Sequence, residues 1–261
     1  LEQYEFKLVA KALSEREVLL KAAPHIIWPM RFVLPHQKHL RPAWMIRTGL
    51  FLYDHLGGRQ TLAGSHGVKF ADHPAGTPLK PEFAKGFAYS DAWVQDARLV
   101  VLNCMDAADR GARIMTRTRA ETAVRNAEGW QVTLKTMDGE TIEVHSRGLA
   151  NAAGPWAVRF LDEVASQKHP YSLRLIKGSH IVVNRLFDHD YAYIFQQPDG
   201  RIVFAIPYER DFTLIGTTDV EHEGAPGRVA IEEDEVRYLC ESANRYFEQS
   251  IGPDDVVWSY S

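Results

Sequence analysis

Four closely spaced runs of β-branched and aromatic residues, between positions 173 and 219, constrain the fold more than any other feature. The runs span residues 173–183, 191–195, 201–208 and 212–219. Runs of this kind, separated by turn residues, are typical of strands joined by hairpins. Turn residues lie at 198–200 and at 209–211. The sequence therefore predicts consecutive antiparallel strands with hairpins at these two positions.

Two of these strands carry polar residues where core residues would be expected. The polar positions are Lys177, Gly178, Ser179 and His180 in the first run, and Gly216, Thr217, Thr218 and Asp219 in the last. Glycine lets a ligand approach the backbone closely, so the cluster would suit a small anionic ligand. Other interpretations stay open, namely a lysine that keeps a strand edge soluble, a β-bulge, a structural histidine and a simple turn at 216–219.

Composition excludes several classes of protein. The chain has 261 residues and a formal net charge of −4, which gives no reason to expect a nucleic-acid partner. Cys104 and Cys240 lie far apart within expected helices, which indicates reduced thiols in a cytosolic compartment. No apolar run approaches the ~20 residues that a membrane-spanning helix needs. Peripheral attachment to a membrane stays open.

Apolar spacing outside the central runs predicts further helices. They are expected at 6–21, 42–56, 96–109 and 231–249. The third of these would bury Leu99, Val100, Leu102 and Cys104. Acidic residues at 232–235 suit the positive end of the last helix dipole, so this turn is expected to be solvated and to have no catalytic role.

The N-terminal third is rich in proline, glycine and histidine. Prolines within 24–42 indicate short or edge strands, because proline removes a donor from the ladder. The histidines there, His25, His36 and His39, fit no compact metal motif, so a solvated loop is favoured and no metal site is expected. Residues 57–85 are expected to form a surface loop, followed by a strand at 87–94.

A β-meander is expected from residue 112 onwards. Its strands would lie at 114–116, 120–124, 130–136 and 141–145. A strand from residue 149 would then end in a small-residue turn, with Pro155 opening a helix. Such a turn admits a ligand close to the backbone and points helix N–H groups toward an anion, although tight packing alone is the more common reason for such a turn. The chain begins without Met and stops within an expected strand at 256–261, so we expect an excised piece of a larger protein.

Three motifs together resemble the FAD-dependent, quinone-linked glycerol-3-phosphate dehydrogenases. They are Asn-Ala-Ala-Gly-Pro-Trp (151–156), Arg-Leu-Ile-Lys-Gly-Ser-His-Ile-Val-Val (174–183) and Ile-Gly-Thr-Thr-Asp (215–219). Stretches at 41–46, 53–56 and 116–120 are also similar to that family, so the resemblance covers nearly the whole chain. The family's Gly-x-Gly-x-x-Gly turn, which binds the FAD pyrophosphate, does not occur in this sequence. We therefore expect an internal fragment that is inactive alone and does not necessarily retain flavin.

The resemblance implies an α+β fold with parts of two domains. A mixed, mainly antiparallel sheet covered by helices would form the substrate domain, as in glycine-oxidase and amino-acid-oxidase flavoenzymes, beside a β-meander portion of the FAD-binding domain. The implied divisions are a helical and loop part of the substrate or cap region at 1–111, the meander and last strand of the FAD-binding domain at 112–156, and the antiparallel-sheet substrate domain at 157–261.

The resemblance also implies roles for particular residues. FAD would contact Arg119, Ala120, Asn151, Ala152, Gly154, Pro155 and Trp156. Substrate would contact Lys177, Ser179, Thr217, Thr218 and Asp219. His180 is the candidate catalytic base, because an imidazole that titrates near neutral pH suits proton transfer.

The implied reaction is the oxidation of sn-glycerol 3-phosphate to dihydroxyacetone phosphate by hydride transfer to FAD, with the electrons passed to a quinone. The implied location is cytoplasmic and peripheral, on the inner face of the cell membrane, with a homodimer left open. Two alternatives remain: an amino-acid-oxidase-type flavoenzyme and a noncatalytic binding module. The first predicts an arginine aimed at a carboxylate, and the polar motifs at 177–180 and 216–219 argue against it.

Overall fold

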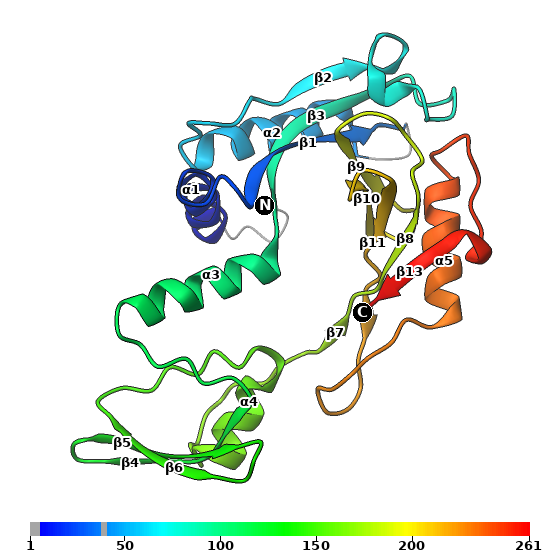
Figure 1. Ribbon diagram of the computed structural model, residues 1–261. Coiled ribbons are helices and arrows are strands. Elements are labelled where there is room, and N and C mark those ends of the chain that lie inside the picture. The colour runs from blue at the N-terminus through cyan, green and yellow to red at the C-terminus, as the bar shows by residue number, and fades with distance from the viewer. Residues whose placement is uncertain (1–5, 38–40) are drawn as a thin grey trace. The chain divides into compact units, whose positions relative to one another are not determined.

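The computed structural model describes residues 6–37 and 41–261, which fall into two compact units (Figure 1). The larger unit contains Leu1–Leu99, Lys177–Val220 and Val229–Ser261. The smaller unit contains Val100–Ile176 and Glu221–Arg228. The expected boundaries after residues 111 and 156 differ from these, and they stay a prediction about functional domains.

A sheet of eight strands forms the larger unit (Figure 1). Its strands lie in the order β13 (Val256–Tyr260), β8 (His180–Asn184), β11 (Phe212–Gly216), β10 (Ile202–Tyr208), β9 (Tyr191–Gln196), β1 (Ile27–Pro35), β3 (Lys85–Val94) and β2 (His66–Lys69). Only the β1–β9 pair is parallel within this sheet, and the other neighbours are antiparallel. The expected mixed, mainly antiparallel sheet is confirmed.

Both predicted hairpins form, but the first strand of the central run takes a different place. β9 pairs with β10, and β10 pairs with β11. β8 does not pair with β9, the next strand along the chain; it lies between β11 and β13. This position places Ile181 and Val183 of β8 beside Ile215 in the buried core.

Helices cover both faces of this sheet. Neighbouring residues of β1 show the two faces, because Val33 belongs to one buried cluster and Phe32 to the other. On the first face α5 (Glu233–Asn244) contacts β8, β10 and β11, and Leu239 is fully buried there. On the second face α2 (Ala43–Leu56) packs through Ile46 and Leu50. The helix α1 (Phe6–Ala22) contacts α2 and β1.

The expectation of short or edge strands at 24–42 is wrong. β1 is nine residues long and lies between β3 and β9. Pro29 is tolerated because the parallel pairing with β9 covers only Arg31 to Val33, so its missing N–H breaks no bond to β9. The part of the expected solvated loop that contains His39 lies outside the described residues.

The expected surface loop at 57–85 is also wrong in its burial. This segment contains β2 and two short 3₁₀ turns, Phe70–Asp72 and Pro74–Gly76. Phe70, Leu79 and Phe83 are buried in the main core cluster. Apolar residues scattered between glycines and prolines therefore pack as core, although they show no regular period.

Helix α3 (Asp96–Asp109) forms over the predicted residues, but its expected burial is wrong. It has no buried residue, and Val100 is 63% exposed. Leu99, Leu102 and Cys104 are half-buried. The described residues contain no other element that packs extensively along this helix.

The smaller unit is built on a meander of three antiparallel strands. These are β4 (Thr118–Asn126), β5 (Gly129–Thr136) and β6 (Thr141–Ser146). A helical segment of three consecutive pieces, Gly154–Trp156, α4 (Ala157–Arg159) and Phe160–Val164, packs on β4. The strands β7 (Ile176–Lys177) and β12 (Val220–Glu221) pair with each other as a separate two-stranded sheet.

Two strands expected in this unit do not form. Residues 114–116 lie outside any strand, because Arg117 has a positive φ of 53° and turns the chain just before β4. Residues 149–152 are also irregular. There the Asn151 side chain accepts a hydrogen bond from Ala153 N and donates one to Ala157 O, which folds the backbone into a turn.

Candidate active site

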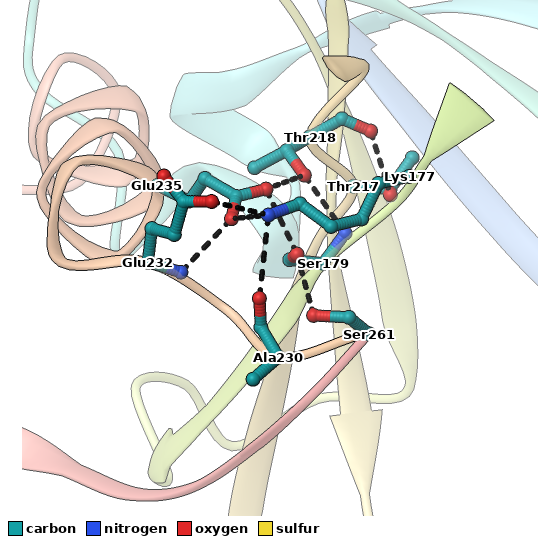
Figure 2. A network of polar contacts seen from close by, with 8 residues as sticks. All are labelled: Lys177, Ser179, Thr217, Thr218, Ala230, Glu232, Glu235 and Ser261. Atoms are coloured by element: carbon teal, nitrogen blue, oxygen red, sulfur yellow. Dashed lines mark hydrogen bonds and ion pairs between the residues drawn. The ribbon is translucent and has the colours of Figure 1, made fainter. Parts of the chain in front are cut away.

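A buried carboxylate, Glu235, organises the polar cluster that the sequence singles out (Figure 2). It lies in the first turn of α5, and its Oε2 is 2.7 Å from Lys177 Nζ. Ser179 Oγ and Thr218 Oγ1 each donate a hydrogen bond to Oε1 at 2.9 Å. The backbone N–H of Glu232 donates to Oε2 at 2.9 Å and closes a capping box. Four donors therefore meet at this one carboxylate.

Direct bonds also join the two polar segments to each other. Ser179 N donates to Thr218 Oγ1 at 2.8 Å, and Thr218 N donates to Ser179 O at 3.2 Å. Thr217 Oγ1 donates to the carbonyl of Thr218 at 2.9 Å. Both segments lie just beyond the ends of regular strands, so these bonds replace the ladder bonds that a continuous sheet would supply.

The electrostatics of the pair keep both groups charged at neutral pH. Burial alone would raise the pKa of Glu235, but the donors from Lys177, Glu232, Thr218 and Ser179 lower it below its usual value. The hydrogen bond to Glu235 raises the pKa of Lys177. Both side chains are only 7% exposed. A charged pair with this burial is stable because its hydrogen bonds are complete.

The expectation of a solvated acidic turn is therefore wrong for Glu235, although Glu232, Glu233 and Asp234 are exposed. A signal for its burial was present in the sequence. Glu235 precedes Leu239 by four residues, so both lie on the same face of a helix. The sequence alone did not show which partners would neutralise the charge there.

His180 lies on the opposite face of the sheet from Glu235. Successive residues of a strand point to opposite faces, and Ile181 packs in the core on the α5 side. The His180 ring stacks on Tyr260 with centroids 4.8 Å apart and planes inclined by 7°. In the sheet, His180 is opposite Gly216 of β11. A β-carbon at Gly216 would lie 2.1 Å from His180 Cδ2, so only glycine fits beneath this ring.

The protonation of His180 follows from its surroundings. Burial lowers the pKa of its imidazole, so the ring is neutral at physiological pH. Its Nδ1 is buried and has no hydrogen-bond partner among the described residues. A neutral imidazole has a free lone pair and can accept a proton. The sequence did not single out Gly216 and Tyr260 as the residues that hold this ring.

The structure brings most of the expected substrate-binding residues together, but the polar groups of several of them already bond to other protein groups. Lys177, Ser179 and Thr218 are buried and bonded within the protein. Thr217 is half-buried and Asp219 is exposed. Direct substrate contacts by these five residues stay a prediction. The contacts of the first three support a role in holding the backbone around His180.

Some of the expected flavin-binding residues meet in the smaller unit. A groove of 540 Å³ lies between the start of β4 and the helical segment, and Arg119, Ala120 and Trp156 are among its lining residues. Asn151 shapes the preceding turn through its amide, and Pro155 occupies the first turn of the helical segment, as expected. Gly154 has a positive φ of 54°, which favours glycine. Ala152 does not line this groove.

Two further findings apply to the described residues alone. No three or more His, Cys, Asp and Glu side chains are grouped so that they could hold a metal ion. No described helix is both long enough and apolar enough to cross a membrane.

The chain matches known proteins over its full length. The model of the FAD dependent oxidoreductase (DAO) family matches residues 1–261. A glycerol-3-phosphate dehydrogenase from Pseudomonas aeruginosa is 53% identical over 261 residues, and a D-erythritol 1-phosphate dehydrogenase from Brucella abortus is 50% identical over 262. Each match covers 100% of this chain but only 50% and 52% of those proteins. The chain thus spans about half the length of these relatives.

Solved structures show the same fold. The glycerol-3-phosphate dehydrogenase from Bacillus halodurans, solved with FAD, aligns with a TM-score of 0.72 at 24% identity, over 97% of this chain and 46% of that one. The glycine oxidase from Geobacillus kaustophilus aligns with a TM-score of 0.64 at 17% identity, over 97% and 62%. The expected fold class and the resemblance to glycerol-3-phosphate dehydrogenases are confirmed.

Proposed function

Because this chain belongs to the FAD dependent oxidoreductase (DAO) family, we propose that the full-length protein oxidises sn-glycerol 3-phosphate to dihydroxyacetone phosphate. The observation that carries this proposal is the 53% identity, over the whole chain, to a protein named glycerol-3-phosphate dehydrogenase. The family match also confirms the predicted flavin-dependent oxidoreductase class. The substrate is proposed because the chain covers only half of that relative.

The groove of the smaller unit supports the proposal that part of the FAD molecule binds there. Ala120 leaves space beside β4, Trp156 offers an aromatic face, and Arg119 supplies a positive charge beside Glu121. The turn is open at Gly154, because no atom lies within 4 Å of the position that a β-carbon would take there. When bound, FAD supplies the acceptor for the hydride from the carbinol carbon of the substrate.

We propose that His180 accepts the proton of the substrate hydroxyl. Oxidation of a secondary alcohol to a ketone releases a hydride from carbon and a proton from oxygen. The neutral imidazole of His180 accepts that proton, and its stacking on Tyr260 and close contact with Gly216 hold it in one orientation. The Glu235 network holds the backbone just before β8, which carries this ring, and just after β11, its neighbour in the sheet.

A second polyol phosphate is the main competing substrate. The relative from Brucella abortus is named D-erythritol 1-phosphate dehydrogenase, and its 50% identity is close to the 53% of the first relative. Both substrates carry a phosphate and a secondary alcohol. An amino-acid substrate has weaker support, because the glycine oxidase shares only 17% identity.

We further propose a quinone as the final electron acceptor and peripheral attachment to the inner face of the cell membrane. The outer side of α2 supports attachment, because Trp44 is 68% exposed and Phe51 is 53% exposed. These residues lie seven apart, on one side of the helix. Co-sedimentation with anionic phospholipid vesicles tests attachment, and a Trp44→Ser/Phe51→Ser variant that still binds fully would refute this surface. A homodimer stays a prediction.

The test of the catalytic proposal uses the full-length protein purified with its flavin. Rates with sn-glycerol 3-phosphate, D-erythritol 1-phosphate and glycine are compared using a dye acceptor. We expect glycerol 3-phosphate to give the highest kcat/KM. His180→Gln should lower kcat by about 10²–10⁴-fold with flavin retained, as loss of a general base does. His25→Gln, at an exposed position, is the matched control. Full activity of His180→Gln would remove His180 from the reaction.

A further inference from the structure

The Glu235 carboxylate has a geometry that suits a positioning role. It joins three separate parts of the chain, namely the segment before β8, the segment after β11 and the start of α5 (Figure 2). Both of its oxygens accept two donors each. An ionised carboxylate has about four acceptor positions, so this one has no capacity left for a ligand.

The two segments that Glu235 joins are those that place the His180 ring. Ser179 immediately precedes His180 in the chain, and Thr218 lies two residues beyond Gly216. Neither 178–179 nor 217–219 belongs to a strand, so no regular ladder fixes their spacing. The cross-links through Glu235, Ser179 and Thr218 set that spacing instead. The close approach of Gly216 to the imidazole leaves little room for variation.

We infer that Glu235 is a positioning residue for the reaction, acting on His180 through the backbone from the opposite face of the sheet. This inference rests on the proposed function of His180. Loss of the carboxylate leaves Lys177 without its closest counter-charge. Only the direct bonds between Ser179 and Thr218 then hold the two segments together, so the segments shift more easily. The imidazole then spends less time in the reactive orientation, and a misplacement of about 1 Å is enough to cost roughly 10²-fold in rate.

The experiment compares two identical substitutions in the full-length, flavin-loaded protein. Glu235→Gln is the test, and Glu17→Gln is the control, because Glu17 is a similarly buried carboxylate at 4% exposure on α1, bonded to Thr61 N. We expect Glu235→Gln to lower kcat by about 10–100-fold with KM for glycerol 3-phosphate nearly unchanged. Glu17→Gln should leave kcat near that of the wild type.

A second readout does not depend on turnover. Diethylpyrocarbonate modifies accessible neutral imidazoles, and peptide mass spectrometry follows His180 alone. We expect His180 to react about threefold faster or more in Glu235→Gln than in the wild type, because local opening exposes the ring, and no faster in Glu17→Gln. If the wild type oxidises no polyol phosphate, the proposed function fails, while this measurement still decides the positioning role.

A further variant guards against simple misfolding. Lys177→Met/Glu235→Leu removes both buried charges, and Glu232, the other carboxylate that contacts Lys177, is exposed to solvent, so we expect this variant to fold with flavin bound. It still removes the acceptor of Ser179 and Thr218, so kcat should remain low and His180 should still react faster. Unchanged kcat and reactivity in Glu235→Gln would overturn the inference. A raised KM with unchanged kcat would also overturn it, since the network would then bind substrate.

Discussion

Replacing Gly216 with alanine tests how His180 is held. The new methyl carbon would lie 2.1 Å from Cδ2, 2.6 Å from Cγ and 2.7 Å from Nε2 of the His180 ring. Carbon atoms pack best at about 3.5–4.0 Å, so the ring must move by roughly 1.5 Å. Tyr260, stacked at 4.8 Å, limits this movement on one side. Overpacking of this kind costs about 1–3 kcal/mol of the free energy of unfolding.

The expected effect on catalysis matches the upper end of the effect on stability, because each tenfold loss of rate corresponds to about 1.4 kcal/mol. A displacement of about 1 Å in a reacting group costs on the order of 10²-fold in rate. Urea unfolding measures the first effect, and kcat with glycerol 3-phosphate measures the second. Gly49→Ala is the control, because no atom lies within 4 Å of its missing side chain; in helix α2 it should stabilise by about 1 kcal/mol.

A double-mutant cycle decides whether the ring is the cause. If the added methyl clashes with His180, Gly216→Ala should cost little stability in a His180→Ala background. An equal loss in both backgrounds would show that the backbone, and not the imidazole, requires glycine. The structural account of the His180 site would then be wrong.

Three further predictions concern pH and flavin binding. The pKa of Glu235 is lowered from 4.5 in the folded protein, so the ionised carboxylate stabilises the fold above that pH, and this stabilisation is lost as the pH falls through the folded pKa. Lys177→Met should lower the free energy of unfolding by about 3 kcal/mol at pH 7. It should also flatten the acid dependence of that free energy, measured by urea unfolding. Burial lowers the pKa of His189 from 6.5 to about 4, so the unfolded chain binds more protons than the folded protein between these two pH values. The free energy of unfolding should therefore fall by roughly 3 kcal/mol on acidification through this range, and this fall should be absent in His189→Gln. Ala120→Trp should fill the groove beside β4 and reduce the bound flavin absorbance, whereas Ala127→Trp, exposed in the β4–β5 turn, should not.

Local patterns in the sequence determined most of the elements. The helices α1, α2 and α3 and the hairpins of the central sheet formed where apolar spacing and turn residues predicted them. These features depend on neighbours within a few residues along the chain. The strand predictions for the short runs at 114–116 and 149–152 were wrong. A positive φ at Arg117 and a hydrogen bond to the Asn151 side chain turn the backbone there, although the composition of both runs favours strands.

Pairing between distant segments was decided only by the tertiary structure. The sequence placed a lysine, a serine, a histidine and threonines in two strands, and it grouped them as one polar cluster. The fold divides them between two faces: Ser179 and Thr218 meet Glu235 of α5 on one side, and His180 meets Tyr260 of β13 on the other. Strand alternation alone separates neighbours in this way, but it does not say which helix or strand covers each face. A buried charge needs partners. For Glu235 they include Ser179, 56 residues away, and Thr218, 17 residues away, which only the folded chain brings within hydrogen-bond distance.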